Sequence, residues 1–233
     1  LGTAKSEAGP AGCGAACHPR AFEIPMCLLL AALDAHPDYK LIIAANRDEF
    51  YARPAAPAHW WHDQPQIFAG RDLQHGGTWL GVSRSGRFAA LTNFRDPRAF
   101  KTDAPSRRSL SRDFLIAEHS ADAHAEALAQ RSSIYNDFNL VLWDGVKACV
   151  FASRGIYSAE INPGISAVSN HLLNTPWPKV VRSKANLAGL LAQPGALQRD
   201  AIFALLRDRS PARDDELPQT GVALTLEREL SPI

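Results

Sequence analysis

The chain has 233 residues, 46% of them hydrophobic, which suits one sizeable domain whose core is stable without disulfides. Basic and acidic residues nearly cancel (25 against 24), so there is no electrostatic reason to expect binding to nucleic acid or to an anionic membrane. Four scattered cysteines exclude a disulfide scaffold, and no apolar run reaches the roughly 20 residues that a membrane span needs. We therefore expect a cytoplasmic protein without a membrane span.

The first 25 residues differ from the rest. They are rich in Ala, Gly and Pro, show no periodicity and begin with Leu, so we expect a disordered or non-native N-terminal extension before a domain over residues 26–233. Met26, the only methionine, is then a plausible start. Cys13 and Cys17 with His18 resemble half a metal site, but no second pair completes it, and we expect no metal.

Strand signals dominate after Met26. Residues 27–33 and 39–45 are apolar runs around a turn-like segment and predict a hairpin, whereas the Pro-rich and Trp-rich residues 53–66 predict a long irregular loop. Two more hairpins are expected at residues 78–83 with 87–93 and 139–143 with 147–152, and single strands at 165–169 and 222–226.

Helical patterns come in two pairs. Residues 109–118 and 121–132 form the first pair, and residues 178–192 and 197–207 form the second. Hairpins on both sides of helix pairs predict an α+β domain in which antiparallel sheets carry helices on their outer faces. The chain contains no GxGxxG motif, P-loop or zinc-ligand spacing, so we expect no bound cofactor.

A polar tetrapeptide, Asn46-Arg47-Asp48-Glu49, follows the apolar strand at residues 41–45. It is either a solvated turn or a site placed at the end of a strand. The partner strand begins at Cys27, so the two strand ends can lie close together.

Cys27 follows Met26, and removal of Met before a small residue would make Cys27 the first residue. An N-terminal cysteine combines a nucleophile with a base, because its α-amine titrates near 7.7 to 8.0 and its thiol near 8.5. Arg47 would favour the thiolate, and Asp48 could orient the amine. The alternative is that Cys27 is a small buried strand residue, as free cysteines often are.

Seven ordered segments carry a resemblance to a known family. They are Met26-Cys27, Asn46-Arg47-Asp48-Glu49-Phe50, Gly76-Gly77-Thr78-Trp79-Leu80-Gly81, Leu91-Thr92-Asn93-Phe94, Phe138-Asn139-Leu140, Ser169-Asn170 and Thr175-Pro176-Trp177-Pro178-Lys179-Val180. Together they closely resemble the NRDE family, which includes the Transport and Golgi organisation 2 proteins. The resemblance covers residues 26–233.

The family is similar to cysteine N-terminal-nucleophile (Ntn) hydrolases, which implies a four-layer αββα fold and cleavage of a small C–N amide. The implied catalytic residues are Cys27 as nucleophile, Asp48 holding the α-amine, and Asn93 and Asn170 binding the oxyanion. Further substrate-binding residues would be Asn46, Arg47, Glu49 and Trp79.

Two positions depart from the hydrolase pattern. The related acylases carry an arginine three residues before their aspartate, where this chain has Ala45. Family members usually continue with another strand and a Tyr-Gly-Thr-Arg segment, which this chain lacks, so we expect the domain to lack its last C-terminal strand.

The resemblance also implies a competing function, non-catalytic haem trafficking or handling of an acyl lipid or acyl-CoA. Haem would then be a transported ligand, and its ligands could come from His59, His62, His75, His171 or Cys27. Trp60 and Trp61 could supply a flat apolar wall, although an amphipathic surface loop is the favoured interpretation of residues 59–62.

Overall fold

The structure is a computed structural model that describes residues 27–47, 49 and 52–233. The predictions for residues 1–25, Met26 and Asp48 therefore lie outside the described residues.

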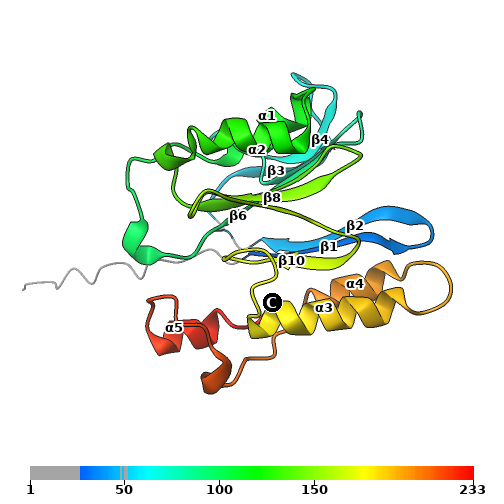
Figure 1. Cartoon of the computed structure of the whole chain (residues 1–233), viewed down its shortest axis with the longest axis vertical. Helices are drawn as coiled ribbons and strands as arrows, with labels where there is room; N and C mark the ends of the chain where they lie inside the picture. Colours follow the sequence, from blue (N-terminus) through cyan, green and yellow to red (C-terminus); the bar gives the residue numbers. More distant parts are fainter. Residues whose placement is uncertain (1–26, 48, 50–51) are drawn as a thin grey trace, which may run out of the picture.

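Two antiparallel sheets form the centre of the molecule (Figure 1). The three-stranded sheet has the order β10-β1-β2, from β1 (Cys27–His36), β2 (Tyr39–Arg47) and β10 (Gly164–Val168). The seven-stranded sheet runs in sequence order through β3 (Ala55–Trp60), β4 (Ile67–Asp72), β5 (Leu80–Ser83), β6 (Phe88–Asn93), β7 (Phe138–Trp143), β8 (Ala148–Ala152) and β9 (Tyr157–Glu160).

Two helix pairs cover the outer faces of these sheets. In Figure 1, α1 (Arg108–Ile116) and α2 (Ala121–Ala129) lie over the seven-stranded sheet, while α3 (Pro178–Leu191) and α4 (Arg199–Leu205) lie under the three-stranded sheet. A short helix, α5 (Leu224–Glu229), follows near the C-terminus. The predicted four-layer αββα fold is confirmed.

Each interface between layers has its own apolar cluster. Leu110 and Phe114 of α1 pack on the outer face of the large sheet, and Val180 and Leu187 of α3 pack against the small sheet. Between the sheets, alternate residues of β1 such as Leu29 meet residues of β6, β7 and β8. Since β1 is buried on both faces, it is apolar at every position from Cys27 to Leu33.

The predicted hairpins at residues 27–45, 78–93 and 139–152 are confirmed, as are both helix pairs. Gly86 and Gly145 lie in the turns of the second and third hairpins with φ of 79° and 96°, a conformation that glycine adopts without steric strain. The predicted single strand at residues 165–169 is β10.

The loop predicted over residues 53–66 was wrong in its first half, because β3 occupies Ala55–Trp60 and pairs with β4. Edge strands tolerate proline, here Pro57, and the register shifts between Ala56 and His59. The surface-loop interpretation of residues 59–62 fails at Trp61, which is 1% exposed and donates its Nε1 hydrogen to the Ala69 carbonyl at 3.1 Å.

The strand predicted over residues 222–226 was also wrong, because α5 begins at Leu224. The backbone N–H groups of Leu226 and Glu227 donate to the Ala223 carbonyl at 2.9 and 3.0 Å, which closes a helical turn. A run of five mostly apolar residues does not separate a strand from a short helix, and tertiary contacts of Glu227 favour the helix here.

Candidate functional site

Three strand ends converge around Cys27. Cys27 begins β1 and pairs in register with Arg47, the last residue of β2. Asn93 is the last residue of β6 and pairs with Phe138, the first residue of β7. The sequence-based expectation that the start of β1 and the end of β2 meet is confirmed.

Asn170 joins these ends, although it lies 143 residues after Cys27. The backbone N–H of Cys27 donates to Asn170 Oδ1 at 3.3 Å, and Asn170 Nδ2 donates to the carbonyl of Asn93 at 3.0 Å. The Asn170 side chain is fully buried, and its own carbonyl accepts from the backbone N–H of Arg95 at 2.7 Å. The structure therefore brings together three of the four predicted catalytic residues, and the fourth, Asp48, lies outside the described residues.

Ser169 and Asn139 support this arrangement and were not among the predicted site residues. Ser169 Oγ donates to the Cys27 carbonyl at 2.7 Å. Asn139, at the second position of β7, donates through Nδ2 to the His171 carbonyl at 3.0 Å and to Thr92 Oγ1 at 3.1 Å. The sequence signal that could have identified Asn139 is an asparagine inside an otherwise apolar strand, since buried amides need hydrogen-bond partners.

A network of arginines and carboxylates lies beside Arg47. Arg47 donates to Glu49 at 2.9 Å, and Arg108, the first residue of α1, donates to the same carboxylate. Arg108 also pairs with Asp72 at 2.8 Å, and Arg53 pairs with Asp72 at 2.7 Å. Arg47 and Glu49, both predicted to bind substrate, are therefore held together by this network.

Asp72 shows the electrostatic character of the network. Burial acts to raise its pKa, but hydrogen bonds from Arg53 and from the Gln74 backbone, with the charge of Arg108, outweigh burial. The pKa of this carboxyl therefore lies below its ordinary value, and Asp72 is ionised at neutral pH.

Arg107 and Arg108 were missed by the sequence analysis. A signal was present, because two adjacent cations at the start of a predicted helix oppose the helix dipole and need another reason to be there. Gly77 allows the close approach: a Cβ at Gly77 would lie 2.4 Å from the Arg108 carbonyl oxygen, which accepts from the Thr78 N–H at 3.1 Å.

The two other residues predicted to bind substrate, Asn46 and Trp79, have different hydrogen-bond partners. The Asn46 side chain donates to the carbonyl of Leu206, just after α4, at 2.6 Å. The Trp79 side chain is partly buried, and its carbonyl accepts from the backbone of Leu91 at 2.7 Å. Their roles in binding substrate stay predictions.

The histidines considered as haem ligands are spread over the molecule. His59 contacts the Pro57 carbonyl and His75 contacts Arg53, both on the side of β3 and β4. Of these histidines, His171 adjoins the site, and its ring contacts those of Phe94 and Trp177 at centroid distances of 4.9 and 5.7 Å. Burial lowers the pKa of His171, so its imidazole is neutral at pH 7.

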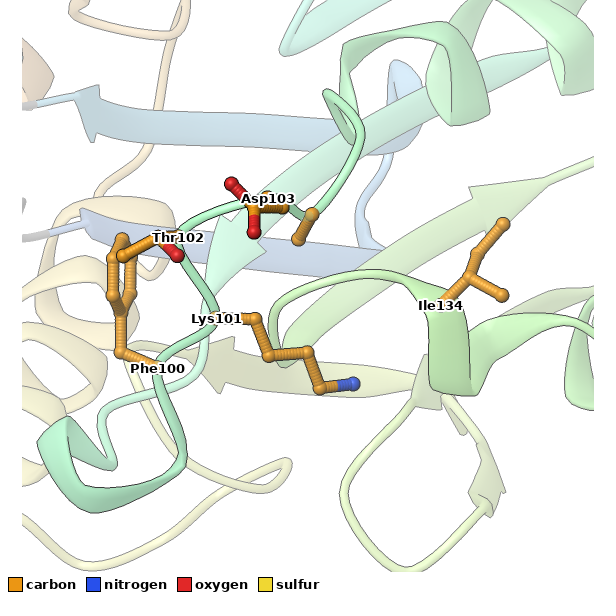
Figure 2. Close-up of a pocket in the computed structure, with 6 residues that line it drawn as sticks. Phe100, Lys101, Thr102, Asp103 and Ile134 are labelled. Carbon is orange, nitrogen blue, oxygen red and sulfur yellow. The ribbon is translucent and has the colours of Figure 1, made fainter.

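An open pocket lies outside the site, between the connection after β6 and the turn before β7 (Figure 2). It is lined by Phe100, Lys101, Thr102, Asp103, Ala104 and Ile134. Lys101 does not offer its amine to the pocket freely, because Nζ donates to the carbonyls of Ser133 and Tyr135. None of the predicted site residues lines it.

Within the described residues, no group of three or more His, Cys, Asp or Glu side chains is arranged to hold a metal ion. No helix in the same part of the chain is long and apolar enough to cross a membrane.

Comparisons with known proteins agree with this architecture. A family model described as Transport and Golgi organisation 2 matches residues 26–233. The chain is 33% identical over 221 residues to the Transport and Golgi organization 2 homolog of Mus musculus, covering 89% of this chain and 80% of that protein. It is 28% identical over 218 residues to Transport and Golgi organization protein 2 of Drosophila melanogaster, covering 82% of this chain and 76% of that protein.

A solved structure shares the fold at 10% sequence identity. It is the Caenorhabditis elegans N-acylethanolamine-hydrolyzing acid amidase ortholog, with a TM-score of 0.53, covering 88% of this chain and 98% of the other. This likeness supports the Ntn-hydrolase type of αββα fold for this chain.

Proposed function

The chain belongs to the Transport and Golgi organisation 2 family, and we propose that it is a cysteine amidohydrolase that cleaves a small C–N amide through Cys27. The observation that carries the proposal is the hydrogen bond between the Cys27 backbone nitrogen and Asn170 Oδ1 at 3.3 Å. This nitrogen becomes the α-amine, and hence the base, if Cys27 is made the first residue.

The surroundings of Cys27 suit such a nucleophile. Ser169 fixes its carbonyl and Asn170 its nitrogen, so both backbone ends of the residue that carries the thiol are held in place. Preorganised groups of this kind lower the barrier because they need no reorganisation during the reaction. Asp48 would hold the ammonium form of the amine, as the resemblance implies.

The proposed reaction has two halves. The α-amine takes the thiol proton, and the thiolate attacks the amide carbonyl, forming a C–S bond while the carbonyl electrons move to oxygen. Amide donors from Asn93 or Asn170 would stabilise this oxyanion, and its collapse breaks the C–N bond as the ammonium protonates the leaving amine. Water, deprotonated by the amine, then hydrolyses the thioester and releases a carboxylic acid and the free thiol.

The test combines intact mass with amide hydrolysis. Mass spectrometry of the purified protein should show a chain that begins at Cys27. The substrate panel begins with N-acylethanolamines, the amide class after which the structural neighbour is named, followed by shorter N-acyl amides. We expect Cys27→Ala to abolish hydrolysis, while the structural Cys149→Ala leaves it within about twofold of wild type, since Cys149 is buried away from the site. Hydrolysis that survives Cys27→Ala ends the proposal.

A second candidate function is carriage of haem or of an acyl ligand, favoured by one observation. His171 is neutral, contacts the rings of Phe94 and Trp177 and directly follows Asn170, so it could ligate iron next to two aromatic side chains. Haem titration should then produce a spectral shift that survives Cys27→Ala and is lost in His171→Ala. If haem gives no shift and acyl ligands give no protection against heat, this candidate is excluded.

A further inference from the structure

Arg107 sits immediately before α1 and is anchored by one nitrogen. Its Nη1 donates to the carbonyl of Asp137 at 2.6 Å, and the same carbonyl accepts from the backbone N–H of Phe94 at 3.1 Å. Phe94 follows Asn93, and Asp137 precedes β7, so Arg107 is attached to the strand ends that carry the candidate site.

Arg107 and Arg108 differ in how their charges are compensated. Arg108 contacts two carboxylates, Glu49 and Asp72, which it shares with Arg47 and Arg53. Arg107 contacts only backbone carbonyls among the described residues, and no carboxylate there lies within ion-pair distance of it. Carbonyl oxygens do not neutralise a guanidinium, so an anion at its remaining N–H groups would be stabilised.

The electrostatics of Arg107 agree with its position. Burial, and then the charge of Arg108, lower its pKa to about 10, so it is still a cation at neutral pH. The groups that act in the opposite direction are Cys27, Asp137 and Glu49. The hydrogen bonds agree with this, because Asp137 and Phe94 connect Arg107 to Asn93, and Asn170 connects Asn93 to Cys27.

We propose that Arg107 is a specificity-determining residue that binds a carboxylate of the substrate through Nε and Nη2. With Nη1 held by Asp137, these two N–H groups form the planar fork that matches a carboxylate in a bidentate manner. The substrate class is then an N-acyl amino acid or a similar amide whose carboxylate lies a few bonds from the scissile C–N bond.

This inference rests on the proposed amidohydrolase function, but its test measures binding alone. Full-length Cys27→Ala protein is titrated calorimetrically with N-acetylglycine and with its neutral counterpart, N-acetylglycinamide. We expect the acid to bind at least about tenfold more tightly than the amide, because charge-assisted bidentate hydrogen bonds are stronger than neutral ones. Adding Arg107→Gln should abolish this preference.

Two further variants separate recognition from folding. Arg107→Lys keeps a charge but loses the fork, so it should lose most of the preference even if Arg107→Gln does not fold. Arg112→Gln, in the helix that follows Arg107, is the matched control: Arg112 pairs with its neighbour Asp113 at 2.7 Å, and this variant should keep the full preference.

Equal binding of the two probes, binding of neither, or a preference that survives Arg107→Gln would each overturn the proposal. A failure of amide hydrolysis in the wild-type chain, with carboxylate preference retained in the Cys27→Ala protein, would instead remove the proposed function and leave the role of Arg107 standing.

Discussion

Two buried cysteines lie in regions of opposite character. Cys27, at the start of β1, is 7% exposed and is surrounded by Ser169, Asn170 and the charge of Arg107. Cys149, near the middle of β8, is 1% exposed and packs in the apolar cluster beneath α1 and α2. Burial alone does not distinguish them, so the difference in chemistry comes from the polar groups that the fold assembles at one end of the sheets.

Selective alkylation is the most direct test of the difference between Cys27 and Cys149. Burial, with the nearby charge of Asp122, raises the pKa of Cys149 to about 12. At pH 8 the thiolate fraction of such a thiol is about a thousandfold below that of an ordinary one, so native Cys149 should react with iodoacetamide at least that much more slowly. Peptide mass spectrometry should show Cys27 modified long before Cys149. Equal rates in the native protein would contradict the comparison, whereas equal rates in guanidinium are expected.

The second test concerns the end of the sheets where the polar groups lie. Arg95, beside Asn170, pairs with Glu227 of α5 at 2.9 Å, and both side chains are at most 3% exposed. Glu227→Ala should lower the free energy of unfolding by about 3 kcal/mol, because the Arg95 charge stays buried without its carboxylate. Denaturant unfolding measures this loss.

The matched control for Glu227 is Asp214→Ala. Asp214 pairs with Arg228 at 2.6 Å, in the same C-terminal region but with both side chains about half exposed. Its loss should cost about 0.5 kcal/mol or less. Equal effects of the two substitutions would show that the Arg95–Glu227 pair is not buried in solution.

A third test measures how pH changes stability through His124, which lies in the apolar region. Burial, followed by the charges of His119, Arg131 and Arg87, lowers the pKa of His124 to about 4, and Asp113 opposes this. In the unfolded state, where its pKa is 6.5, His124 takes up a proton at a higher pH than in the folded state. The contribution of the neutral imidazole to stability is therefore complete above pH 6.5 and is lost as the pH falls towards 4. The loss should reach about 2–3 kcal/mol, given about 1.36 kcal/mol per unit.

Denaturant unfolding at several pH values, compared with His124→Gln, isolates this contribution. The variant should show a shallower fall in stability between pH 6.5 and 4. Parallel curves for wild type and His124→Gln would refute the assignment.

The smallest expected effect is at Asn139. Asn139→Ala removes the hydrogen bonds to Thr92 and to the His171 carbonyl, and should cost about 2 kcal/mol because buried acceptors lose their donor. Thermal unfolding measures the loss, and the exposed Asn186→Ala in α3 should change stability by about 0.5 kcal/mol or less. A neutral Asn139→Ala would mean that the amide does not brace Ser169 and Asn170.

Much of the fold followed from local patterns. The β1–β2 hairpin was predictable because both strands are apolar and a polar turn separates them, and α3 because its apolar positions share one face. β3 was not predictable, because an edge strand that is mostly exposed and contains Pro57 has no apolar alternation to detect. The proximity of Cys27 to Asn170 came only from family resemblance, since nothing local specifies a contact across 143 residues.

The long separation between Cys27 and Asn170 also bears on the order of folding. Strands adjacent in the seven-stranded sheet are neighbours in sequence, and apart from the β6–β7 connection that carries α1 and α2 they are joined by short loops, which close at little entropic cost. β1, in contrast, pairs with β10, which lies more than a hundred residues further along the chain. Non-local pairings of this kind form slowly, so we expect the small sheet to be completed last, and a nascent chain to carry Cys27 without its partners until β10 has left the ribosome.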